Sequence, residues 1–296
     1  MFELNYKAKG KILFITHSSS RFFAELALHK GGSLQKLKLN DIEIIKDLHP
    51  LTYEGTYASS ILFPFANRIK DGKYTFKGKH FQFPVNVAEE NNALHGLVFN
   101  KTFSLVENHL NKNSAKIVLE YNEKDKAICF PFTYNLQLIY TFTEGEINLE
   151  MKVKNTSSSS FPFTVGWHPY FYTNNLRNCT LQFNAKNKMI LDDRNITIDT
   201  KTVKSFEGIA IQNNQFDDCW ELKSDTVVFT TPDYKLTFNA TGNNNFLQVY
   251  TPPKKDTIAI EQTTGVSDSF NNQIGLANLP ANEVYQINWS LLLENK

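Results

Sequence analysis

An apolar side chain occupies every second position of the segment Tyr134-Asn135-Leu136-Gln137-Leu138-Ile139-Tyr140-Thr141-Phe142. The chain then turns at Glu144-Gly145, and the same period of two returns at alternate positions from Ile147 to Val153. Successive side chains of a β-strand point to opposite faces of the sheet. The two segments therefore predict an antiparallel hairpin with one apolar face and one polar face.

Strand signals recur along most of the chain, whereas helical periodicity is weak. Turn-forming residues separate the segments, and no alternation of strands with long helices is present. This pattern is typical of an all-β protein, built as an antiparallel sandwich or barrel. No composition shift marks a boundary, so we expect one domain over residues 1–296. Further strands are expected at 73–76, 81–83, 161–167, 227–230, 246–251, 257–261 and 284–293.

The charge balance argues against a protein that binds nucleic acid, because 31 basic residues face 30 acidic ones. A small neutral ligand fits this balance better than a polyanion does. No run of about 18 apolar residues is present, so we expect no membrane span. The N-terminus lacks the features of a signal peptide, and the three cysteines form no CxxC pair. We therefore expect a cytoplasmic protein with reduced thiols.

Two of the seven histidines lie in surroundings that suit a cleft, and the other five are expected at the surface. His95 follows the polar loop 89–92, and His168 ends the expected strand 161–167 directly before Pro169. Proline has no backbone donor and keeps the preceding residue extended, so the strand should end there. Taken alone, each of the two histidines fits a structural role better than a catalytic one.

Glu261 comes directly after the apolar run 257–260. Partial burial there would raise the pKa of its carboxyl toward the range of a general base, although an exposed position at the rim of the sheet is also open. Asn67 and Arg68 follow the apolar segment 63–66. The planar guanidinium suits sugar hydroxyls, and a surface salt bridge is the alternative.

Asp217 and Asp218 precede Trp220, and sugar sites often combine a carboxylate with an aromatic ring. A solvated turn is the other interpretation of this segment. The sequence has no GxSxG, Walker A, GxGxxG or HExxH motif, and no helical spacing of metal ligands. We therefore expect neither a metal nor a cofactor.

Together, these segments resemble the aldose 1-epimerase (galactose mutarotase) family, and the resemblance runs from about Gly32 to the C-terminus. Any one motif is weak, but their order along the chain is that of the family. The loop after Tyr250-Thr251 departs from it, because Pro252-Pro253 stands where the family often has Gly-Asn. The segments are Asn67-Arg68-Ile69, Leu94-His95-Gly96, Gly166-Trp167-His168-Pro169-Tyr170-Phe171, Phe216-Asp217, Leu247-Gln248-Val249-Tyr250-Thr251 and Ala259-Ile260-Glu261.

The resemblance implies a large antiparallel β-sandwich with a sugar cleft on one sheet face. It implies that Glu261 is the general base, that His168 is the general acid, and that His95 positions and polarises the ring oxygen. Glu261 and His168 should face each other across a pocket with room for one pyranose ring. The residues implied to bind or support the other hydroxyls are Arg68, Asn67, Asp217 and Gln248, with alignment favouring Asp217 over Asp218.

The implied partner is a small-molecule sugar, with no nucleic acid and no membrane, and the protein would act as a monomer or homodimer. A hexose-6-phosphate epimerase of the same superfamily stays open, with Lys254-Lys255 supplying part of a phosphate pocket. A non-catalytic sugar-binding protein on the same fold is a further alternative. The last alternative is a different carbohydrate enzyme with a similar sandwich, such as a glycosidase. A glycosidase would need a pair of carboxylates that flank the glycosidic bond it cleaves.

Overall fold

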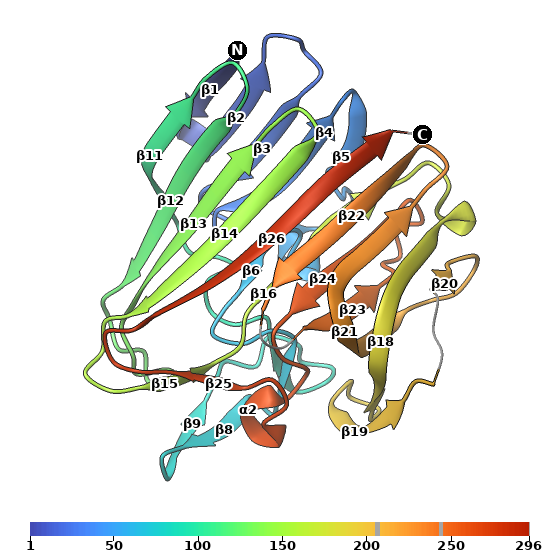
Figure 1. Ribbon diagram of the computed structural model, residues 1–296. Coiled ribbons are helices and arrows are strands. Elements are labelled where there is room, and N and C mark those ends of the chain that lie inside the picture. Colours follow the sequence, from blue (N-terminus) through green and yellow to red (C-terminus); the bar gives the residue numbers. More distant parts are fainter. Residues whose placement is uncertain (205–207, 243–244, 296) are drawn as a thin grey trace.

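The computed structural model describes residues 1–204, 208–242 and 245–295. It confirms an all-β protein with large antiparallel sheets, arranged as packed layers (Figure 1). The α-helices among the described residues are single turns, α1 (Tyr53–Thr56) and α2 (Ser269–Asn272). No helix in this part of the chain is long and apolar enough to cross a membrane.

A five-stranded antiparallel sheet opens the chain. Its strands follow one another in sequence order, so each is joined to its neighbour by a short connection. Alternate side chains such as Leu13, Ile15 and Leu26 are buried against the larger sheet. The strands are β1 (Phe2–Lys7), β2 (Ile12–His17), β3 (Phe23–Ala27), β4 (Ser33–Leu39) and β5 (Ile42–Ile45).

The larger sheet contains the predicted hairpin, in which Leu138 lies opposite Met151 and both are fully buried. Four further strands lie off its main path: β17 (Tyr170–Tyr172), β18 (Thr180–Leu191), β19 (Thr197–Thr202) and β20 (Ile209–Ala210). The main path runs β11 (Ser104–Leu110), β12 (Ala115–Glu123), β13 (Tyr134–Phe142), β14 (Glu146–Asn155), β26 (Val284–Asn295), β22 (Tyr234–Thr241), β21 (Asp217–Thr230), β23 (Phe246–Tyr250), β24 (Thr257–Thr263), β16 (Gly166–Trp167) and β6 (Ile61–Leu62).

Strand β21 carries the larger sheet from one layer into the other. Its residues 226–230 pair with β22, and its residues 217–221 pair with β23. Strand β24 consequently lies across β22 and β26, where the Gln262 side chain donates to Phe238 O (2.8 Å) and the Trp289 indole donates to Gln262 O (3.1 Å). Since side chains alternate along β24, Gln262 faces this interior and Glu261 faces the opposite side.

The expected strand 161–167 is interrupted in the structure. It divides into β15 (Phe161–Phe163) and β16, because Thr164 N donates to Pro64 O and Val165 N to the Thr264 hydroxyl instead of continuing a ladder. Three small two-stranded sheets complete the fold, pairing β7 (Arg68–Lys70) with β10 (Asn92–Leu94), β8 (Lys73–Phe76) with β9 (Lys79–Gln82), and β15 with β25 (Ala277–Leu279).

The alternation along β13 makes a direct prediction about stability. Leu138→Ala removes a fully buried side chain and should lower the free energy of unfolding by about 2–5 kcal/mol, because a cavity replaces lost contacts. Thr141→Ala, on the other face of the same strand, should change it by less than about 0.5 kcal/mol. Urea unfolding of both variants measures the difference, and equal losses would contradict the assigned faces.

Candidate active site

A cavity of about 440 Å³ opens between β7, β10, β17, β21, β23 and β24. All seven residues predicted from the sequence line it, although they are up to 194 positions apart in the chain (Asn67 to Glu261). The seven are Asn67, Arg68, His95, His168, Asp217, Gln248 and Glu261. The fold therefore brings the whole predicted set together.

Strand register explains one wall of the cavity. Glu261 of β24 lies directly opposite Gln248 of β23, and Tyr250 of β23 lies opposite Asp217 of β21. Residues that are paired or two positions apart share a face, so all four side chains point to the cavity while Gln262 points inward. Asp218 points away from this face, and its carboxylate pairs with Lys188 (2.7 Å), so Asp217 is the cavity residue.

Backbone contacts hold the two histidines in place. His168 lies just past β16, where its N–H donates to Ser60 O and its carbonyl accepts from Ser59 N. His95 has a φ of +63° and is followed by Gly96 at +76°, where a Cβ would meet Phe63 O at 2.2 Å. Only glycine fits there. The imidazole rings consequently meet edge to face, with centroids 4.8 Å apart.

The Nε2 atom of His168 lies 3.4 Å from Oε1 of Glu261. Only 4% of His168 and 2% of Glu261 is exposed, so both groups are almost fully withdrawn from solvent. The prediction that they face each other across a ring-sized gap is wrong, because a ring cannot fit within 3.4 Å. Both side chains instead lie side by side against the same part of the cavity.

Burial dominates the electrostatics of this pair. Desolvation raises the pKa of Glu261 well above its ordinary value, with nearby Asp217 adding to the rise and Arg68 opposing it. Desolvation lowers the pKa of His168 to about 3, and that of His95 well below its usual range with a further contribution from His168. Both shifts favour the uncharged forms of the pair, the carboxylic acid of Glu261 and the neutral imidazole of His168.

Amide and carboxylate groups form a continuous network beside that pair. Asn67 Nδ2 donates to Gln248 Oε1 (3.2 Å), and Gln248 Nε2 donates to Asp217 Oδ1 (2.7 Å). Burial raises the pKa of Asp217, and Arg68 opposes that rise from 3.7 Å. Glu90 was not among the predicted site residues, yet it accepts two hydrogen bonds from Arg68 and lines the cavity.

Several other lining residues were also missed. Tyr170 lies within the Gly166–Phe171 segment, and its ring stacks on that of His168 with centroids 5.0 Å apart, so its neighbours were a usable signal. Tyr57 and Asn195 come from a short helical turn and a β-turn with no recognisable motif. Nothing in the local sequence marks these two as site residues.

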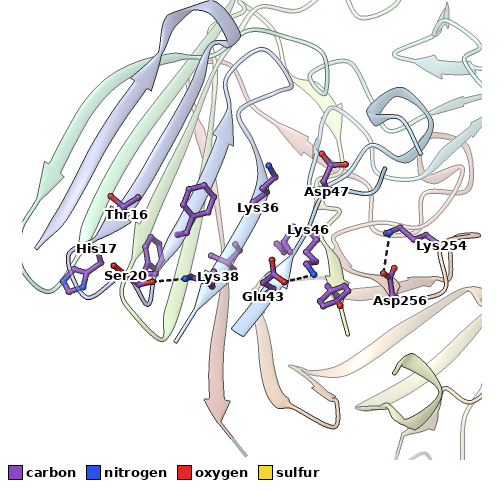
Figure 2. A pocket seen from close by; sticks show the side chains of 15 residues that line it. Thr16, His17, Ser20, Lys36, Lys38, Glu43, Lys46, Asp47, Lys254 and Asp256 are labelled. Carbon is purple, nitrogen blue, oxygen red and sulfur yellow. Dashed lines mark hydrogen bonds and ion pairs between the residues drawn. The ribbon is translucent and has the colours of Figure 1, made fainter. Parts of the chain in front are cut away.

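A larger groove of about 860 Å³ lies between strands β2–β5 and β17 (Figure 2). It contains none of the seven predicted residues. Its lysines are paired with carboxylates. Lys46 lies 2.6 Å from Glu43 and Lys254 lies 3.5 Å from Asp256, and dashed lines mark these two pairs in Figure 2. Lys254, the candidate phosphate-binding residue, therefore belongs to this groove and not to the cavity.

The family model described as aldose 1-epimerase matches residues 15–291. The chain belongs to the aldose 1-epimerase family. A relative in Escherichia coli (strain K12), the uncharacterized protein YihR, is 21% identical over 278 residues, which cover 90% of this chain and 89% of YihR.

Solved structures agree with this aldose 1-epimerase family fold. A galactose mutarotase-like protein from Clostridium acetobutylicum superposes with a TM-score of 0.87 at 19% identity, over 100% of this chain and 99% of the other. The galactose 1-epimerase of Lactobacillus acidophilus gives a TM-score of 0.82 at 16% identity, over 100% and 99% of the two chains. At these identities, the structural likeness supports the fold alone.

The buried histidine predicts a loss of stability in acid. The ordinary pKa of histidine is 6.5, so His168 takes up a proton below that pH in unfolded chains. In the folded protein, its imidazole stays uncharged until about pH 3. The stability is present above pH 6.5 and should fall as the pH drops, by at most about 1.4 kcal/mol per pH unit for this group. Urea unfolding between about pH 7 and about pH 4 should show a shallower slope for His168→Gln.

The matched control is His109→Gln, which changes an exposed histidine on β11. It should keep the wild-type slope. Equal slopes in wild type and His168→Gln would mean that His168 is not held neutral in the folded protein.

Proposed function

We propose that the protein is an aldose 1-epimerase that interconverts the α and β anomers of an unphosphorylated hexose. The observation that supports this most strongly is the 3.4 Å approach of His168 Nε2 to Glu261 Oε1 in a cavity of about 440 Å³. Ring opening needs a proton removed from the anomeric hydroxyl and another delivered to the ring oxygen. Those two oxygens are bonded to the same carbon, so a base and an acid must stand next to each other.

Glu261 acts as the base and His168 as the acid. The carboxylate takes the proton of the anomeric hydroxyl, the carbonyl forms as the bond from the anomeric carbon to the ring oxygen breaks, and the imidazolium protonates that oxygen. Rotation about the next carbon–carbon bond exposes the other face of the carbonyl, and closure reverses both transfers. His95, whose ring contacts that of His168, helps to position the ring oxygen.

The reaction needs only one proton on the pair. Burial favours the carboxylic acid and the neutral imidazole, so the proton first passes from Glu261 to His168 Nε2, 3.4 Å away, when the sugar binds. Ring opening then starts from the carboxylate and imidazolium and returns the carboxylic acid and neutral imidazole. The two states differ by one proton transfer through the sugar, so no charge has to enter or leave the buried site. Arg68, Asp217 and Gln248 would hold the remaining hydroxyls, with Asn67 supporting Gln248.

The charges around the cavity support a neutral sugar over a phosphorylated one. Five carboxyl side chains line it, and Arg68 is the one Lys or Arg among the described lining residues. Arg68 is already engaged by Glu90 and lies beside Asp217. A phosphate would therefore meet repulsion without a free cation. The carboxyl groups are those of Glu54, Glu89, Glu90, Asp217 and Glu261.

Removing the base tests the reaction directly. Glu261→Gln keeps the shape of the side chain but cannot accept the proton, so the rate of anomer equilibration should fall about 10²–10⁴-fold. Polarimetry of freshly dissolved α-glucose and α-galactose measures it, with Glu107→Gln on exposed β11 as the control. Folded wild-type protein that accelerates neither sugar would leave the non-catalytic sugar-binding alternative as the better one.

Phosphorylated substrate supplies the second test. Glucose 6-phosphate should be converted with a kcat/KM at least about tenfold below that of the best free hexose, because like charges repel at the cavity. Added salt should narrow this gap by screening the rim carboxylates. Faster conversion of the phosphate ester would replace this proposal with a hexose-phosphate epimerase.

A further inference from the structure

Glu90 holds the guanidinium of Arg68 in a two-pronged contact. Arg68 Nε donates to Glu90 Oε2 at 2.5 Å, and Nη2 donates to Glu90 Oε1 at 2.9 Å. Such a paired contact fixes the plane of the guanidinium as well as its position. The remaining nitrogen, Nη1, makes one long contact of 3.4 Å with Asn67 Oδ1. Arg68 is thereby held at the cavity wall by Glu90.

The carboxylate of Glu90 is itself held from behind. Asn195 Nδ2 donates to Oε1 (3.0 Å), and Asn92 Nδ2 donates to Oε2 (3.3 Å). Each oxygen of Glu90 therefore serves Arg68 on one side and an amide on the other. Partial burial opposes the ionisation of Glu90, but Arg68 and, to a smaller extent, these two amides outweigh it and lower its pKa, which favours the carboxylate.

Arg194 ties the two supporting segments together. It lies in the turn between β18 and β19, and its Nε donates to Glu90 O at 2.6 Å. Its Nη2 reaches Asp71 Oδ1 (2.8 Å), Asn91 O (2.9 Å) and Asn92 Oδ1 (2.9 Å). A turn about 100 residues further along the chain is thus fastened to the loop that carries Glu90.

We propose that Glu90 is a positioning residue for sugar binding, which holds Arg68 in its binding orientation and away from Asp217, and that Arg194 and Asn195 lock Glu90 in place. This inference rests on the proposed function, because it takes Arg68 to bind the sugar. Without Glu90, the guanidinium is free to move toward the Asp217 carboxylate, 3.7 Å from Nη2. Both groups would then be drawn away from the sugar hydroxyls.

The experiment separates sugar binding from chemistry. Glu90→Gln replaces one acceptor by a donor that opposes Arg68, so KM for the better hexose substrate should rise about 10–100-fold, with kcat changed by less than about threefold. Arg68→Lys should raise KM similarly. If the two residues act as one unit, the double variant should be no worse than about twofold beyond the poorer single variant.

The control is Glu120→Gln, because Glu120 also accepts from amide side chains but lies on β12, away from the cavity. It should leave both constants unchanged. Asn195→Ala, which leaves Glu90 and Arg68 intact, should raise KM by a smaller factor, and it serves as the test if Glu90→Gln fails to fold. The proposal would be overturned if Glu90→Gln lowered kcat by about 10–100-fold without raising KM, or if the effects of Glu90→Gln and Arg68→Lys were additive in the double variant.

A failure of the proposed function would look different. If wild-type protein binds a hexose in calorimetry but does not speed its equilibration, the enzymatic proposal fails, and the same variants are compared by their dissociation constants. The positioning proposal then predicts the same pattern of losses. Wild-type protein that binds neither glucose nor galactose would overturn both.

Discussion

The period of two along β24 is the constraint on which the site depends. Gln262 is fixed in the interior by hydrogen bonds to the backbone of β22 and from Trp289 of β26. Its neighbour Glu261 must therefore face the other way, next to Gln248 and close to His168. A shift of register by one residue would exchange the two and place a carboxyl in the apolar interior. The register of β24 therefore determines both the packing between the layers and the position of Glu261 in the cavity.

Burial of Glu261 and His168 costs free energy that the rest of the fold has to offset. The pKa shifts of the two groups express this cost, because both oppose the charged form. Core packing around the rings of Trp167 and Trp289 stabilises the same strands from the other side. Bringing an acidic and a basic side chain together in a buried cavity therefore lowers the stability of the fold.

Much of the architecture could be predicted from the sequence, because alternating segments such as 134–142 signal strands through purely local chemistry. The interruption after Phe163 could not, since the groups that capture Thr164 and Val165 come from Pro64 and Thr264, far away in the chain. Likewise, ordered motifs predicted the seven residues that line the cavity together, whereas Glu90 and Asn195, which line it too, have no local signal. Their importance arises only when the turn 192–196 meets the loop 86–92.

The long-range contacts also explain how the fold tolerates five carboxyl groups around one cavity, where their charges would repel one another. Asp217 is neutralised in part by Arg68 and accepts from Gln248, Glu90 is held by Arg68 and two amides, and Glu261 can keep a proton because it is buried. The rim residues Glu54 and Glu89 are exposed, where water screens them. Each carboxyl is therefore accommodated by a different physical means. Arg68 connects Glu90, with which it forms an ion pair, to Asp217, which lies 3.7 Å away. The positive charge of Arg68 also opposes the rise in the pKa of Glu261, so the position of the guanidinium affects how readily Glu261 keeps its proton.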